Sequence, residues 1–348
     1  MYFGLSEDQI FFQDNVKKFL EDQLTLDTVR KITEGEDDLA KEELHKGLIN
    51  LGINNILVPE EYGGLGLDLL FATAVSQSLG EGVATLPFLG PYILAPTAIK
   101  YGASDSQKEK LFADMSQNLI NFGIGFSEYF GSRDSSGLNI SDNKVTGKTL
   151  FVLDTDFASH VMIADNKGQI GIVSLDSNDI EMIDLTTVDK TRTYKEMHFS
   201  DTPIEILDKT KSSSFAIEMA LDAGRIIAAA DSLGASQAMI NKAVEYSKER
   251  KQFNRVIGSF QAVKHMCAEM AAELEPCYSL VWHAAHCFDD SSEDARLMAC
   301  LAKSHISEVS KMVSKKATEV HGGMGFTDLL GLHSVSYTHL TLPTTSPV

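Results

Sequence analysis

One short segment concentrates residue types that suit a ligand with both phosphate charge and a flat ring. Residues 249–261 place three cations, an aromatic ring and an amide in one turn, among them Arg250, Phe253 and Gln261. A guanidinium pairs with two phosphate oxygens, and an aromatic ring offers a flat apolar face. The alternative is a solvated cation at a helix C-terminus, where the helix dipole favours positive charge.

A second turn of this kind, 321–325 (HGGMG), follows some sixty residues later. Gly322 and Gly323 leave backbone N–H groups uncovered by side chains, so a phosphate or ribose can approach. The alternative is a helix C-cap, the commonest use of glycine at a helix end, and the two readings are compatible. Together the two turns favour a dinucleotide-type cofactor held between helices.

Composition excludes several classes of partner. The 348 residues carry 30 basic and 49 acidic side chains, a net charge of −19, which argues against nucleic acid or an anionic membrane surface. The N-terminus does not resemble a signal peptide and no apolar run is as long as a membrane span, so we expect a cytoplasmic protein.

The four cysteines are spaced by 10, 10 and 13 residues, which fits no metal motif, so we expect no metal and reduced core thiols. They are Cys267, Cys277, Cys287 and Cys300.

Hydrophobic periodicity divides the chain into three sections. The pattern is helical from about Ser6 to Leu111, has a period of two from about 120 to 207, and is helical again from about 213 to 318. Short apolar runs separated by turn residues predict an antiparallel β-domain in the middle, a sandwich or barrel. The predicted fold class is α+β, mainly α, with an N-terminal helical domain, a middle β-domain and a C-terminal four-helix-bundle domain.

Helix ends follow from capping residues. Ser6 followed by Gln9 predicts a capping box. Long helices are predicted over about 215–250, 259–288 and 294–320, with Ser259 as the N-cap of the second.

The predicted domain boundaries are 1–119, 120–210 and 211–333. Residues 334–348 are rich in Thr, Ser and Pro without an apolar period, and we interpret them as a non-native tail. The alternative is a genuine flexible tail.

Three motifs in this order resemble those of the acyl-CoA dehydrogenase family: VPEEYGGLG at 58–66, KQF to VKH at 251–265, and EVHGGMGFT at 319–327. The resemblance covers roughly 1–333. It implies FAD bound between the β-domain and the C-terminal bundle, usually with help from a second subunit. It further implies an acyl-CoA substrate oxidised to a trans-2-enoyl-CoA, and an electron-transfer flavoprotein as acceptor. It also implies a role in lipid metabolism, such as fatty acid β-oxidation, and a homo- or hetero-oligomer, a dimer or tetramer.

The resemblance assigns roles to both turns. It implies that Arg250 meets the FAD pyrophosphate, while Phe253 and Gln261 meet the adenosine end. The alternatives are core packing for Phe253 and a water-facing first helical turn for Gln261. The glycine turn, Gly322 and Gly323, would also contact FAD. Glu319 stands where the family usually has glutamine, and an anion near phosphate is unfavourable.

The resemblance also implies flavin contacts in the β-domain. The family's Thr-Glu-Pro-x-Ala-Gly-Ser-Asp segment corresponds to 126–134 (FSEYFGSRD), which lacks the proline and has a different length. Ser127 would bond the polar edge of the flavin. Phe151, in the segment GKTLFVL, would pack on the isoalloxazine; the alternative is one more strand core residue.

The catalytic carboxylate is missing from both positions the family uses. One lies in a segment beyond the glycine motif that this chain does not have. The other precedes an arginine on the first long helix of the bundle, and here Gly224 precedes Arg225. Asp231, seven residues on, lies on the same helix face and is a candidate, with a surface or interface carboxylate as the alternative, whereas Asp222 points roughly the opposite way. The catalytic residue is therefore left unknown.

Three explanations of the missing base remain open: a base in a lost native C-terminus, a base on a partner subunit, or a non-catalytic flavin-binding subunit. The main hypothesis is an FAD-dependent acyl-CoA dehydrogenase subunit. The alternatives are a non-catalytic FAD-binding partner of a heteromeric dehydrogenase, and a flavin oxidase or monooxygenase on the same fold.

Overall fold

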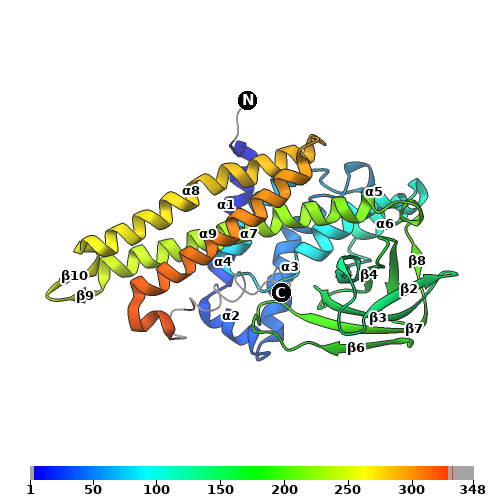
Figure 1. The fold of residues 1–348 in the computed structure, drawn as a ribbon, viewed down its shortest axis with the longest axis horizontal. Coiled ribbons are helices and arrows are strands. Elements are labelled where there is room, and N and C mark those ends of the chain that lie inside the picture. The colour runs from blue at the N-terminus through cyan, green and yellow to red at the C-terminus, as the bar shows by residue number, and fades with distance from the viewer. Residues whose placement is uncertain (1–3, 328–330, 332–348) are drawn as a thin grey trace.

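The computed structural model describes residues 4–327 and 331, which form long helices beside a β-domain (Figure 1). The predicted tail, 334–348, lies outside the described residues. The capping box is confirmed, because the Gln9 N–H donates to Ser6 Oγ at 3.2 Å and the Ser6 N–H donates to Gln9 Oε1 at 2.8 Å. The N-terminal helices are α1 (Glu7–Gln23), α2 (Leu26–Thr33), α3 (Asp38–Asn50), α4 (Leu69–Gly82), α5 (Ala95–Gly102) and α6 (Asp105–Ser116).

The middle section forms one eight-stranded sheet, in the order β6-β7-β3-β1-β4-β5-β8 with β2 paired to β3. All pairs are antiparallel, as predicted, except β1 with β4. Strands β3 and β4 flank β1 on its two sides and run in opposite directions, so β4 must run parallel to β1. The strands are β1 (Phe122–Gly125), β2 (Gly137–Ser141), β3 (Lys144–Leu153), β4 (His160–Ala164), β5 (Ile170–Ser174), β6 (Ile180–Asp184), β7 (Tyr194–Pro203) and β8 (Glu205–Ile206).

Alternation along the strands gives the sheet two apolar faces. On β4, Met162 belongs to a core shared with α5, α6 and the start of α7, whereas Val161 and Ile163 belong to a core made of β-domain residues alone. The sheet is therefore anchored to the helices through one face only.

The C-terminal section contributes three long helices, α7 (Phe215–Glu249), α8 (Gln261–Asp289) and α9 (Ala295–His321). They pack on one another and on α4, so that one core runs from α1 through α9. The prediction of Ser259 as the N-cap of α8 is wrong: Ser259 Oγ donates instead to Val256 O in the preceding turn, and α8 begins one residue after Phe260. Within the described residues no helix is long and apolar enough to cross a bilayer.

The four cysteines are free thiols, as predicted, but not all are core residues. Cys277 and Cys287 are buried and Cys267 is half-buried, whereas Cys300 is exposed on α9. The prediction of a core thiol is therefore wrong for Cys300, because it lies on the outer side of an amphipathic helix.

Helices α4 and α7 cross in backbone contact. A Cβ on Gly234 would lie 1.8 Å from Gln77 O, and a Cβ on Gly80 would lie 2.1 Å from Asp231 O. Neither position therefore accepts any side chain without separating the helices. The crossing sets the distance between the two helices that wall the cavity described below.

We expect Gly234→Ala to destabilise the protein by about 2–3 kcal/mol, because overpacking at the crossing outweighs the roughly 1 kcal/mol that alanine adds to helix propensity. The matched control is Gly323→Ala, whose Cβ would meet nothing within 4 Å. Denaturant unfolding of the flavin-free proteins measures both. Equal stability of the two variants would contradict the claim that the crossing leaves no room for a side chain at Gly234.

Candidate functional site

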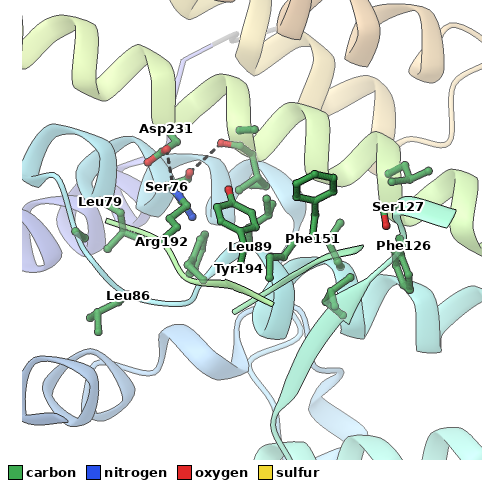
Figure 2. Close-up of a pocket in the computed structure, with 18 of the residues that line it drawn as sticks. Ser76, Leu79, Leu86, Leu89, Phe126, Ser127, Phe151, Arg192, Tyr194 and Asp231 are labelled. Carbon is green, nitrogen blue, oxygen red and sulfur yellow. Dashed lines mark hydrogen bonds and ion pairs between the residues drawn. The ribbon is translucent and has the colours of Figure 1, made fainter. Parts of the chain in front are cut away.

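A cavity of about 510 Å³ lies where the β-domain meets α4 and the first half of α7 (Figure 2). Most of its lining is apolar, and its polar groups gather towards the two ends. The lining residues are Ser76, Leu79, Ala84, Leu86, Phe88, Leu89, Leu94, Ile124, Phe126, Ser127, Phe130, Arg133, Phe151, Leu153, Arg192, Tyr194, Leu221, Ile227, Ala228 and Asp231.

The β-domain supplies one end, where two predicted flavin contacts meet. Figure 2 shows Ser127 beside Phe126, with Phe151 nearby in the middle of the cavity. Ser127 Oγ donates to Leu150 O at 2.5 Å, and the buried Glu128 carboxylate accepts the Leu150 N–H at 3.2 Å. These bonds fix the Ser127 turn against strand β3.

Phe151 is directed into the cavity by an irregularity in β3. The register with β7 shifts between Thr149 and Val152, and Phe151 has a φ of +54°. A bulge re-aims a side chain, and a left-handed conformation is rare for a bulky residue. The alternative of an ordinary strand core residue is therefore not supported: Phe151 is half-buried and faces the cavity.

The opposite end holds an ion pair, of which the sequence analysis identified Asp231 but not Arg192. Arg192, in the loop before β7, donates from Nη2 to Asp231 Oδ2 of α7 at 3.0 Å (Figure 2). Burial disfavours the charged guanidinium, but the carboxylates of Asp231 and Asp154 outweigh it and raise the pKa of Arg192. Beside this pair, burial raises the pKa of Tyr194 to about 12, so its hydroxyl stays protonated.

Asp154 connects this end to the segment that leads into α5. Its Oδ2 accepts the Gly90 N–H at 2.7 Å, at the first residue of a π-helical turn, Gly90–Leu94. Burial raises the pKa of Asp154 to about 6, against the opposing effects of Arg192 and the Gly90 N–H. The carboxylate thus holds the turn that carries two cavity residues, Leu89 and Leu94.

The position that corresponds to the family's base carries no side chain in this chain, because it is Gly224. A Cβ on Gly224 would meet Leu94 Cδ2 at 2.8 Å, the end of a flexible side chain that lines the cavity. Asp222 pairs with Arg225 and does not line the cavity, in keeping with the sequence analysis. Asp231 does line it, and is the one carboxylate among the lining residues of the described chain, but it is bound to Arg192.

The predicted adenosine and pyrophosphate contacts lie together on another, exposed turn. Strands β9 (Lys251–Gln252) and β10 (Arg255–Val256) form a hairpin, and Phe253 and Asn254 have φ values of +52° and +62°, as in a type I′ turn. Phe253 is 87% exposed, so the core-packing alternative is wrong. Arg250 and Gln261 are exposed on either side of the hairpin.

The glycine turn ends helix α9. Gly322 is its C-cap with a φ of +57°, and a Cβ on Gly322 or Gly323 would meet nothing within 4 Å. The helix C-cap reading is confirmed, and the open space beside both glycines is compatible with the predicted ligand contact. Glu319 is exposed on the last turn of α9.

The cavity and the exposed turn do not meet within one chain. The cavity is lined by the first half of α7, and the hairpin of β9 and β10 follows its C-terminal end (Figure 1). Nineteen residues separate Asp231 from Arg250, about 28 Å along the helix. The residues that the resemblance assigns to FAD therefore lie in two separate places of the chain, here called half-sites, as expected if a second subunit helps to hold the cofactor.

Comparisons with known proteins agree with this fold. Models of the N-terminal and C-terminal domains of acyl-CoA dehydrogenases match residues 6–118 and 215–340. The butyryl-CoA dehydrogenase structure from Megasphaera elsdenii superposes with a TM-score of 0.86 over 99% of this chain and 96% of that one, at 22% identity. The chain therefore belongs to the acyl-CoA dehydrogenase family, and is an FAD-dependent oxidoreductase.

Curated relatives include two named for reduction. The chain is 28% identical to a 3-(aryl)acrylate reductase of Clostridium sporogenes over 82% of this chain and 81% of the relative. It is 25% identical to a subunit of a caffeyl-CoA reductase–Etf complex of Acetobacterium woodii over 94% and 90%. The family members that this chain resembles thus include one associated with an electron-transfer flavoprotein.

The residues present fit FAD as two separate groups, one suited to the flavin ring and one suited to the phosphates. The aromatic face of Phe151 and the hydroxyl of Ser127 suit a flat ring with a polar edge, and the exposed cations and open glycines suit phosphate. The strained, exposed Phe253 supports this fit, because a bulky residue held at positive φ without core contacts indicates a functional constraint.

We expect Phe253→Ala to weaken FAD binding about tenfold without lowering thermal stability, because a stacked ring contributes on the order of 1–3 kcal/mol and this ring is outside the core. The control is Phe11→Ala on α1, also an exposed ring at 68%. Equilibrium dialysis of FAD measures both. Unchanged FAD affinity in the Phe253 variant would contradict the assignment.

Proposed function

We propose that this chain is the FAD-binding subunit of an acyl-CoA dehydrogenase that interconverts an acyl-CoA thioester and its trans-2-enoyl-CoA. The observation that carries the proposal is the mainly apolar cavity beside Ser127 and Phe151. One end suits the flavin ring, and the remaining apolar length suits an acyl chain. Bound FAD supplies the acceptor for the hydride that leaves the β-carbon.

The chain's own residues would bind and orient the flavin ring and the acyl chain. Phe151 would support the flat ring from the β-domain, and Ser127, whose proton is donated to Leu150 O, would offer its oxygen as an acceptor at the polar edge. Leu221, Ile227 and Ala228 of α7 present an apolar wall that keeps water from the acyl chain. Exclusion of water strengthens every electrostatic interaction inside the cavity.

A complete site requires a second chain. The cavity and the exposed turn lie about 28 Å apart along α7, so we infer that each FAD would lie in the cavity of one chain and against the turn of another. The partner is a second copy or a related subunit.

We further propose a cytoplasmic oligomer in lipid metabolism, such as fatty acid β-oxidation, which exchanges electrons with an electron-transfer flavoprotein. The Etf-associated relative supports the exchange with an electron-transfer flavoprotein.

The proposal predicts flavin and substrate-dependent bleaching. Protein purified with and without a co-expressed neighbouring subunit should carry FAD, and acyl-CoA should bleach the flavin absorbance where a base is present. The reverse reaction, reduction of an enoyl-CoA by the dithionite-reduced protein, should proceed in the same preparations, because the protonated base returns the α-proton while the reduced flavin supplies the hydride. Absence of flavin in every preparation would sink the proposal, and direct oxygen consumption without a dye acceptor would favour an oxidase or monooxygenase.

A second candidate is a non-catalytic FAD-binding partner. The observation that favours it is Gly224, together with the pairing of Asp231, the one carboxylate that lines the cavity within the described residues, with Arg192. The Asp231 carboxylate is directed at the Arg192 guanidinium, so it is not positioned to accept a proton from a substrate. On this reading the proton acceptor belongs to the partner chain.

We expect Gly224→Glu, combined with Leu94→Ala to make room, to raise acyl-CoA-dependent dye reduction about a hundredfold, within the range of a positioned general base. The rate should rise with pH as the new carboxylate ionises. Gly224→Gln with Leu94→Ala is the control, of equal size without a base. Equal rates for the two double variants, or full activity in the unaltered chain alone, would show that Gly224 is not the vacant position.

A further inference from the structure

The inner end of the cavity is polar, although an alkyl acyl chain needs no polar partner there. Arg192, Tyr194 and Asp231 line this end, on the far side of Phe151 from Ser127 (Figure 2). The side chains of Arg192 and Asp231 are 17% and 11% exposed. The end of a substrate that fills the cavity would therefore meet a guanidinium, a carboxylate and a phenol hydroxyl.

This polar end is not explained by stability. Withdrawing two charges from water costs several kcal/mol, and an apolar pair of similar volume is often as stable as a buried ion pair. The neighbouring crossing of α4 and α7 is already fixed by Gly80 and Gly234. A polar ligand group would compensate for the desolvation that an alkyl chain would increase.

The charges around Arg192 decide which polar group fits. The carboxylates of Asp231, Asp154 and Asp189 all lie near enough to favour its charged form. One guanidinium therefore faces more than one carboxylate, while Lys303 acts on Asp231 and Lys41 on Asp154. The region is close to neutral, and a ligand carboxylate beside Arg192 would still be repelled by Asp231. A hydroxyl or keto oxygen meets the same donors without that repulsion, and a hydrogen bond to a charged donor is stronger than one between neutral groups.

Building on the proposed function, we infer that the Arg192–Asp231 end of the cavity binds the distal end of the acyl group, and that this end carries a neutral oxygen, a hydroxyl or keto group. Arg192 and Tyr194 supply the donors. Asp231 holds the guanidinium in place and accepts from a hydroxyl. Arg192 and Asp231 are thus specificity-determining residues, and the reaction that supplies the substrate must leave an oxygenated acyl end.

Three CoA thioesters of nearly equal size test the inference: 3-phenylpropanoyl-CoA, its 4-hydroxyphenyl analogue and its 4-carboxyphenyl analogue. Dissociation constants are measured by calorimetry on the FAD-loaded protein, with its partner subunit where one is required. The hydroxyl compound should bind about tenfold more tightly than the phenyl compound, and the carboxylate should bind most weakly.

The double variant Arg192→Met/Asp231→Leu removes both charges without leaving one unpaired. It should reduce the preference for the hydroxyl compound to less than about twofold while leaving the affinity for the phenyl compound within about threefold. The isosteric Tyr194→Phe should reduce the preference severalfold, and decides the case if the double variant does not fold. The control is Arg296→Met, which removes an arginine from an exposed ion pair with Glu218 outside the cavity and should leave all three constants unchanged.

The outcomes separate the inference from the function on which it rests. If none of the three thioesters binds, the proposed function is wrong as well. If all three bind equally, or the carboxylate binds most tightly, acyl-CoA binding stands and the neutral-oxygen site is overturned. A hydroxyl preference that survives in the variants would also overturn the assignment to these residues.

Discussion

The contact between α4 and α7 at their glycines is the constraint on which the cavity depends. Because Gly80 and Gly234 carry no Cβ, the two backbones approach until neither position can accept one. The helices remain in contact towards the cavity, where Ser76 Oγ donates to Ile227 O at 2.9 Å. Both helices line the cavity, through Ser76 and Leu79 of α4 and Ala228 and Asp231 of α7. The close crossing fixes the width of the cavity in a way that flexible side chains at the same positions would not.

On the side of the β-domain, the cavity wall is held to the helices by charged and polar contacts as well as by packing. Arg192 reaches from the sheet to Asp231 on α7, and Asp154 reaches from the end of β3 to the Gly90 N–H in the π-helical turn. A π-helical turn carries weaker backbone bonding than an α-helix and is frequent at functional sites. The buried charges thus hold three elements in register around one ligand site, so the same residues that orient the domains face the substrate.

Local signals predicted most of the fold and only part of the site. The capping box at Ser6, the long helix beginning near 215 and the strand runs are local, so periodicity found them. The parallel pairing of β1 with β4 depends on β1 lying between β3 and β4 in the sheet, and no local pattern reports that order. Ser259 failed as an N-cap because a preceding short helical turn uses its hydroxyl.

The site residues divide in the same way. Phe253 and Gly322 stand in motifs, so the sequence singled them out, and their exposed placement is a backbone property of turns. Arg192 stands in no motif. Its importance arises from a partner 39 residues away in sequence, on another domain. Asp231 was found only because a helix period placed it on the face of Gly224, and its pairing changed its expected role from a base to an anchor.

The separation of the half-sites along α7 places a requirement on the chemistry. In the proposed arrangement, a chain whose cavity holds the flavin ring would contribute its own exposed turn to a different FAD, so that binding at one site and assembly of the other would be linked through α7. Linkage of this kind makes cofactor affinity depend on oligomer concentration. It also allows the two chains of an assembly to differ. One chain can keep the cavity and lose the base, as Gly224 indicates here, provided that the chain beside it supplies a carboxylate to a working site.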